Sequence, residues 1–155
     1  MSASLRVVFD CNVFMQAIAA PGGPAGRCVE LALTGQVTLY TSPIVLSEIR
    51  RVTSHPKLIN KFRLRPDRIA ALFENLPKFA VMIPTVPELW SYHRDPDDAH
   101  YVNLALAADA RLIVSRDKDL LDLMDSTKPE AAEFQKRYPT LRILNPVGFL
   151  REIGA

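Results

Sequence analysis

Short apolar runs that alternate with helical segments constrain the fold of this 155-residue chain more than any other feature. The runs at 5–9 (LRVVF) and 111–115 (RLIVS) are almost continuously apolar, which is typical of strands buried on both faces of a parallel sheet. Further strands are expected at 37–42 (VTLYTS), 80–84 (AVMIP) and 142–145 (RILN). Strand and helix alternate throughout, so we predict an α/β fold of three layers (α/β/α), with a mostly parallel central sheet flanked by helices.

The length is that of one domain, so residues 1–155 are expected to fold as a single unit. Ser42 and Pro43 predict the start of a helix, since Ser is favoured as N-cap and Pro at the first helical position. Residues 126–139 are polar and contain two prolines, and we interpret them as a surface excursion.

Nothing in the sequence indicates a membrane or a secreted protein. No run approaches the ~20 apolar residues of a bilayer span, and the apolar run near the N-terminus is too short for a signal peptide. The two cysteines, Cys11 and Cys28, form no disulfide framework or CxxC motif, which favours buried reduced thiols. We therefore expect a cytoplasmic protein.

Charge is divided along the chain. From Arg50 to Lys78 there are eight Lys or Arg against two acids, and from Glu88 to Asp125 there are nine acids against four bases. The basic stretch is therefore suited to bind polyanions, and the acidic stretch is suited to bind cations.

Four acids fall at strand ends or near helix starts, where sites form in open α/β sheets. Asp10 ends the first strand, Asp117 follows the run at 111–115, Asp98 begins a helix, and Glu48 lies in the helix that starts at Ser42. Converging carboxylates repel one another unless a cation is present. Hard oxygen ligands without a Cys/His cluster indicate Mg²⁺ or Mn²⁺.

Single acids in this part of the sequence can also be explained by a purely structural role. Asp95 and Asp97 are suited to cap a helix, Glu48 to pair with Arg50 or Arg51, and Asp122 to lie on the solvated surface. The three histidines show no ligand spacing. The case for a metal site depends on four acids occurring together.

Four stretches resemble the PIN-domain family, especially its small prokaryotic members that are toxin components of toxin–antitoxin pairs (VapC-like). They are VVFDCNVF (7–14), SPIVLSEI (42–49), DPDDAHYVNLALAADARLIVSRDKDLL (95–121) and ILNPVGFL (143–150). The family's acidic motifs match Asp10 with Asn12, Glu48, Asp98 seven residues before Ala105, and Ser115 with Asp117. The resemblance runs from about Leu5 to Leu150, and the order and spacing of the motifs make it specific.

The resemblance implies a divalent-metal-dependent endoribonuclease, in which a water activated by the metal attacks the RNA phosphorus. Asp10, Glu48, Asp98 and Asp117 would bind Mg²⁺ or Mn²⁺ and carry out catalysis. Supporting roles would fall to Asn12, Ser115, Asp95 and Asp119, the first two orienting carboxylates. An antitoxin protein and a second copy of the chain are the partners that the family implies, besides the RNA substrate.

The basic stretch provides a path for RNA to approach these acids through sequence-independent phosphate contacts. The residues expected to bind RNA are Arg51, Lys57, Lys61, Arg63, Arg65 and Arg68. A solvated basic face is the alternative.

Other functions stay open. An aspartyl-phosphate phosphatase would have a second acid at the position of Asn12, and a receiver domain would have paired acids after the first strand. No phosphate-binding Gly-rich loop with Lys is present. A non-catalytic RNA- or protein-binding module with the same fold is the alternative from another class, for which the stripe Ile69, Leu72, Phe73 and Leu76 could bind a partner.

Overall fold

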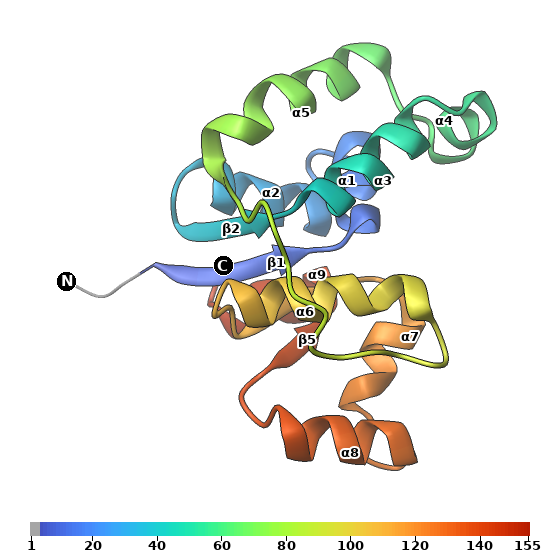
Figure 1. Cartoon of the computed structure of the whole chain (residues 1–155). Coiled ribbons are helices and arrows are strands. Elements are labelled where there is room, and N and C mark those ends of the chain that lie inside the picture. The colour runs from blue at the N-terminus through green and yellow to red at the C-terminus, as the bar shows by residue number, and fades with distance from the viewer. Residues whose placement is uncertain (1–3) are drawn as a thin grey trace.

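The computed structural model describes residues 4–155 (Figure 1). The strands are β1 (Leu5–Phe9), β2 (Val37–Thr41), β3 (Ala80–Met82), β4 (Leu112–Val114) and β5 (Arg142–Leu144). The α-helices are α1 (Cys11–Ala19), α2 (Pro24–Leu33), α3 (Pro43–Thr53), α4 (Pro56–Phe62), α5 (Pro66–Phe79), α6 (Ala99–Ala107), α7 (Lys118–Leu121), α8 (Pro129–Arg137) and α9 (Pro146–Glu152). Short 3-10 helices lie at η1 (Pro96–Asp98) and η2 (Asp122–Met124).

Within residues 4–155 five strands form one sheet in the order β3-β2-β1-β4-β5, and every neighbouring pair is parallel. The chain moves outward from β1 to β3 on one side and then returns to place β4 and β5 on the other. The order therefore reverses between β1 and β4, and a crevice is expected beyond the carboxyl ends of these two strands.

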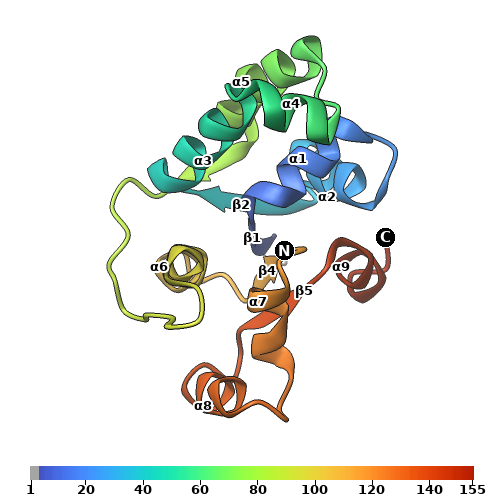
Figure 2. The same cartoon turned by 90° about the vertical axis from the view of Figure 1, so that its right-hand side faces the viewer.

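Helices cover both faces of the sheet. Figure 2 looks onto the edge at which the parallel strands end, with α6 on one side of the sheet and α2 and α9 on the other. The helices α3, α4 and α5 lie together at the top of Figure 2, beyond β2. The predicted α/β fold with a parallel sheet between helical layers is confirmed.

The two central strands are apolar because they are buried on both faces. Val7, Val8 and Phe9 of β1 and Ile113 and Val114 of β4 are all at most 1% exposed. The ring of Phe9 contacts Phe14 of α1 and Phe149 of α9. The apolar stripe of α5 also packs on this core, since Leu72 and Leu76 are buried and Ile69 and Phe73 are half-buried against it.

Polar residues at the strand ends also start the following helices. Asp10 accepts a hydrogen bond from Val13 N at 3.0 Å, Ser42 from Val45 N at 3.3 Å, and Asp117 from Asp119 N at 2.8 Å. The residues that cap these helices thus also place their side-chain oxygens at the carboxyl edge of the sheet.

Residues 126–139, interpreted as a surface excursion, are mostly exposed, but they are not without regular structure. They contain α8, whose residues Ala131 and Phe134 are at most 2% exposed. Pro129 occupies the first turn of this helix, where its missing N–H costs nothing, and Phe134 packs against Trp90 and Tyr138.

No helix among residues 4–155 is long and apolar enough to span a bilayer.

Gly26 of α2 packs against the loop that precedes the helix. A Cβ at this position would lie 2.0 Å from the carbonyl oxygen of Pro21. We expect Gly26→Ala to lower the free energy of unfolding by at least about 3 kcal/mol, since backbone must shift to relieve the overlap. Gly22→Ala is the matched control, because a Cβ there meets nothing within 4 Å. Urea unfolding of both variants tests this, and equal midpoints would contradict it.

Candidate metal site at the carboxyl edge of the sheet

A cleft of about 1170 Å³ lies where the strand order reverses. It brings together residues from the ends of β1 and β4, from α3, and from the start of α6. The predicted site residues that line it are Asp10, Asn12, Glu48, Arg51, Asp95, Asp98 and Asp117. Ser115 is fully buried next to Asp10, and Asp119 belongs to the acidic cluster described below.

Asp10 is held between the first turn of α1 and the residue that follows β4. It is 2% exposed, its Oδ1 accepts the N–H of Val13, and its Oδ2 accepts the hydroxyl of Ser115. Ser115 in turn accepts the N–H of Asp117 at 2.9 Å. Burial raises the pKa of Asp10 to about 6, although the hydrogen bonds from Ser115 and Val13 oppose this. The hydroxyl of Ser115 thus links the carboxylate of Asp10 to the backbone of Asp117.

Asp98 is the least compensated carboxyl group in the cleft. It is 8% exposed, and its Oδ2 has no hydrogen-bond partner among residues 4–155. Burial, together with the neighbouring Asp117 and Asp95, raises its pKa to about 9. A buried oxygen aimed among other carboxylates is the environment in which a bound cation compensates most.

The acidic cluster consists of Asp95, Asp98, Asp117 and Asp119, each of which offers one oxygen within 4.8 Å of the others. Three of its members have other partners. Asp95 accepts the N–H of Asp97 at 3.2 Å, Asp117 accepts the N–H of Asp119 at 2.8 Å, and Asp119 forms an ion pair with Arg94 at 2.6 Å. Asp98 has the unpartnered oxygen and lies beside Asp117, so these two are the candidate centre of a cation site, and the oxygen-only donor set suits Mg²⁺ or Mn²⁺.

Glu48 projects from α3 into the same cleft and is held by α6. Its Oε2 accepts the hydroxyl of Tyr101 at 2.6 Å, and Nε2 of His100 contacts its Oε1. Burial works to raise the pKa of Glu48, but the hydrogen bonds from His100 and Tyr101 outweigh it, and the pKa is lowered. Glu48 thus stays ionised without a cation.

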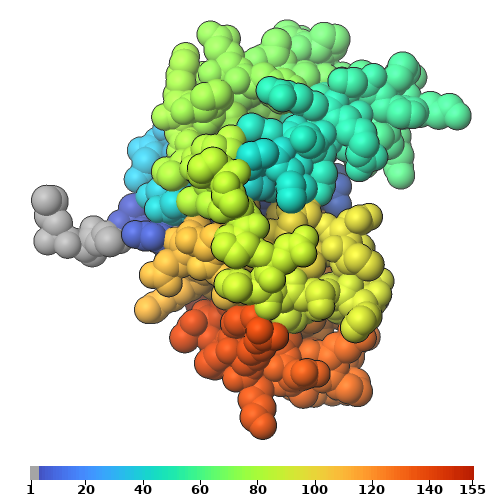
Figure 3. Space-filling view, in the orientation of Figure 1, coloured from blue at the N-terminus to red at the C-terminus, as the bar shows by residue number. Residues whose placement is uncertain are grey.

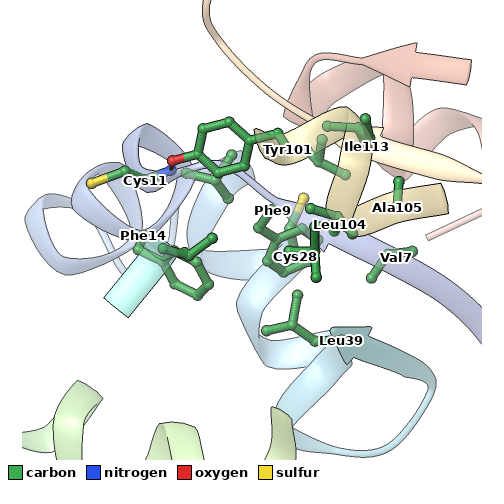
Figure 4. Packing of buried hydrophobic residues seen from close by; sticks show 14 of the residues in the cluster. Val7, Phe9, Cys11, Phe14, Cys28, Leu39, Tyr101, Leu104, Ala105 and Ile113 are labelled. Atoms are coloured by element: carbon green, nitrogen blue, oxygen red, sulfur yellow. Dashed lines mark hydrogen bonds between the residues drawn. The ribbon is translucent and has the colours of Figure 1, made fainter. Parts of the chain in front are cut away.

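Tyr101 is a site residue that sequence reasoning missed, and so is His100. Tyr101 is 3% exposed and accepts the N–H of Cys11 at 3.0 Å, so it also contacts α1 (Figure 4). Their one signal in the sequence is position, because both fall within three residues of Asp98. Pairing of Glu48 with Arg50 or Arg51 was considered instead, whereas its partners come from α6.

Other side chains differ from their predicted surroundings. Asn12 is exposed, and within residues 4–155 its side chain forms no hydrogen bond to the carboxylates. Asp122, which was expected on the solvated surface, forms ion pairs with Arg94, Lys118 and Lys128.

The segment between β3 and α6 borders the cleft and crosses the face seen in Figure 3. Oδ1 of Asn103 accepts the N–H groups of Leu89 and Trp90, and the hydroxyl of Tyr92 donates to the carbonyl of Asp119 at 2.9 Å. With the ion pairs of Arg94, these contacts fix the segment beside the acidic cluster.

The basic residues lie on one side of the cleft. Arg51 lines it, and Lys57, Lys61, Arg63 and Arg65 are exposed on or next to α4 and α5. Arg65 pairs with Asp67 at 3.1 Å. Arg68 is half-buried and donates to the carbonyl of Ile18 at 3.2 Å, so it helps to anchor α5 on α1.

Comparisons with known proteins agree with this architecture. A family model described as PIN domain matches residues 6–119. An uncharacterized protein of Methanocaldococcus jannaschii is 33% identical over 124 residues, which are 80% of this chain and 78% of that protein. A chain in the crystal structure of VapBC2 from Rickettsia felis, bound to a DNA fragment from its promoter, superposes with a TM-score of 0.53. It covers 91% of this chain and 98% of that chain, and at 16% identity it shows likeness of fold alone.

Proposed function

The chain belongs to the PIN domain family, and on that basis we propose that it is a Mg²⁺- or Mn²⁺-dependent endoribonuclease that hydrolyses RNA phosphodiester bonds. The observation that carries this proposal is the environment of Asp98. Its unpartnered oxygen is buried beside Asp117 at the point where the strand order reverses. Such an arrangement is unfavourable in the free protein and becomes favourable when a divalent cation is bound.

When bound, the cation would lower the pKa of an attacking water and stabilise the charge on the phosphate. Asp98 and Asp117 would hold it, with Asp10 and Glu48 completing the catalytic set. Ser115 would keep Asp10 and Asp117 at a fixed spacing through its two hydrogen bonds. Asp95 and Asp119 would have supporting roles, and Asn12, exposed at the cleft, would be free to contact substrate.

A cleavage assay tests this function. Labelled RNA, single-stranded or structured, is incubated with the protein in EDTA, in Mn²⁺, and in Mn²⁺ with Asp10→Asn. We expect cleavage by the unmodified protein in Mn²⁺ alone. Mn²⁺ binding without cleavage would instead favour a non-catalytic RNA- or protein-binding module of the same fold.

RNA would approach over α4 and α5. Arg51 is the basic residue that lines the cleft, and Lys57, Lys61, Arg63 and Arg65 extend outward from it along the chain. Arg68 would contribute mainly through the net charge, because its guanidinium is already bonded to Ile18. Exposed cations at a cleft lined with acids would attract a polyanion that the acids alone repel.

Reversing the charge at Lys57, Lys61 and Arg63 should weaken RNA binding and flatten its salt dependence. Each lost phosphate contact reduces the log–log slope by about 0.7 for single strands. The matched control reverses Arg27, Lys136 and Arg151, which are exposed on α2, α8 and α9. Fluorescence anisotropy across a salt series measures both quantities. Equal slopes in the two triple variants would place the RNA path elsewhere.

We further propose that the protein is a VapC-like toxin in the cytoplasm, that an antitoxin protein binds it, and that it forms a homodimer. The fold likeness to a chain of a VapBC2 structure supports this proposal. Light scattering reports the mass of the purified protein, and a mass equal to the 17.3 kDa chain would remove the homodimer.

A further inference from the structure

Glu48 differs from the other acids of the cleft, because both of its carboxylate oxygens are held by one turn of α6. His100 contacts Oε1, and Tyr101 donates to Oε2 at 2.6 Å. The same turn begins immediately after Asp98, whose Oδ2 has no partner among residues 4–155. The start of α6 therefore positions Asp98, the least compensated carboxylate of the cleft, and also orients Glu48, the most compensated one.

The hydroxyl of Tyr101 has an unambiguous role in this arrangement. A phenol has one proton, which Tyr101 gives to the Glu48 carboxylate, so its oxygen is free to accept the N–H of Cys11 at 3.0 Å. Cys11 directly follows Asp10. The hydroxyl thus connects three helices that each carry or directly follow a proposed ligand: α3 carries Glu48, α6 follows Asp98, and α1 follows Asp10.

We propose that Tyr101 and His100 are positioning residues, which fix the carboxylate of Glu48 relative to Asp98 and Asp10 for divalent-cation binding. This inference rests on the proposed function only in requiring that the cleft bind a cation. Hydrogen bonds to ligating carboxylates typically change metal affinity by about 10- to 100-fold.

A purely structural role would have a different signature. The ring of Tyr101 packs in the core among residues such as Phe9, Leu104 and Ile113, and phenylalanine would preserve that packing (Figure 4). Tyr101→Phe therefore removes the bonds to Glu48 and Cys11 and leaves the apolar contacts. If the hydroxyl acts through Glu48, its loss should have no further effect once Glu48 has been replaced.

The experiment is a double-mutant cycle read by Mn²⁺ affinity in calorimetry. The proteins are the unmodified chain, Tyr101→Phe, Glu48→Gln and the double variant. We expect each single variant to bind Mn²⁺ about 10-fold more weakly, and the double variant to match Glu48→Gln. Unchanged affinity in either single variant, or losses that multiply in the double variant, would overturn the proposal.

Two further sets of variants separate positioning from folding. Tyr40→Phe is the control, because Tyr40 lies on β2 under Arg6, away from the cleft, and should bind Mn²⁺ as the unmodified chain does. His100→Gln keeps a donor for Glu48 and should retain most of the affinity, whereas His100→Leu should lose it. Equal affinities in the two His100 variants would contradict positioning by this side chain.

The outcomes also separate this inference from the proposed function. Affinity is measured without RNA, so the cycle can hold in a protein that cleaves nothing, and then only the ribonuclease proposal fails. Cleavage in Mn²⁺ together with an unchanged affinity in Tyr101→Phe would leave the ribonuclease and remove the positioning role.

Discussion

Replacing Asp98 with asparagine is expected to raise the stability of the metal-free protein while abolishing its response to Mn²⁺. The buried Asp98 carboxylate has an unpartnered oxygen and lies beside Asp117 and Asp95. Asparagine keeps the size of the side chain and is neutral, so the folded protein no longer has to take up a proton at this position or hold a buried charge. The gain in free energy of unfolding should be about 1–3 kcal/mol, or roughly 2–10 °C in melting temperature.

The same substitution removes a proposed ligand, so Mn²⁺ should no longer raise the melting temperature, and cleavage of RNA should fall by about 10²- to 10³-fold. The matched control is Asp97→Asn, which removes the same charge one residue earlier from an exposed position outside the acidic cluster. Differential scanning calorimetry with EDTA or Mn²⁺ measures both effects. A lower metal-free stability in Asp98→Asn than in Asp97→Asn would contradict this account of the site.

The metal-free protein should lose stability as pH rises from about 5 to 9. Burial raises the pKa of Asp10 to about 6 and that of Asp98 to about 9, both from an ordinary 3.8. The folded state therefore holds protons that the unfolded state has released, and the free energy of unfolding falls with pH between the ordinary pKa and the raised pKa of each group. Asp10 alone should account for about 3 kcal/mol between about pH 4 and 6, of which roughly 1.4 kcal/mol is lost above pH 5.

Glu48 has the opposite sign, since its pKa is lowered, but its effect is confined to pH values below its ordinary pKa of 4.5. Melting temperatures in EDTA at pH 5, 7 and 9 isolate the two aspartates. Mg²⁺ should remove most of the decline in melting temperature, and Asp10→Asn should remove the part of it that lies below about pH 6. A melting temperature in EDTA that is constant or rises over this range would show that the two carboxylates are compensated within the protein.

Much of the fold was predictable because local rules and tertiary packing agree. Continuous apolar runs mark β1 and β4, which are buried on both faces, and Ser42 with Pro43 marks the start of α3. The helix α8 was missed because its apolar positions, Ala131 and Phe134, are few within a polar segment whose prolines indicated a loop. That residues 1–155 form a single domain stays a prediction.

The candidate site was predictable to the level of which acids share an edge of the sheet. Parallel strands carry Asp10 and Asp117 to the same edge, and the family motifs place Glu48 and Asp98 nearby. The side chains that contact these acids could not be predicted, because such contacts join residues that are distant in the sequence. His100 and Tyr101 contact Glu48 across more than fifty residues of sequence. Arg94 forms an ion pair with Asp119, and no rule of sequence spacing predicts this contact.

We propose that Asp98 and Asp117 bind one divalent cation between them. Anomalous diffraction from a crystal soaked in Mn²⁺ detects such an ion directly. We expect a peak about 2.0–2.2 Å from an oxygen of each carboxylate, with Asp10, Glu48 or Asp95 close by. A crystal in which Mn²⁺ binds only outside the cleft, or in which Asp98 and Asp117 stay free of metal at saturating Mn²⁺, would contradict it.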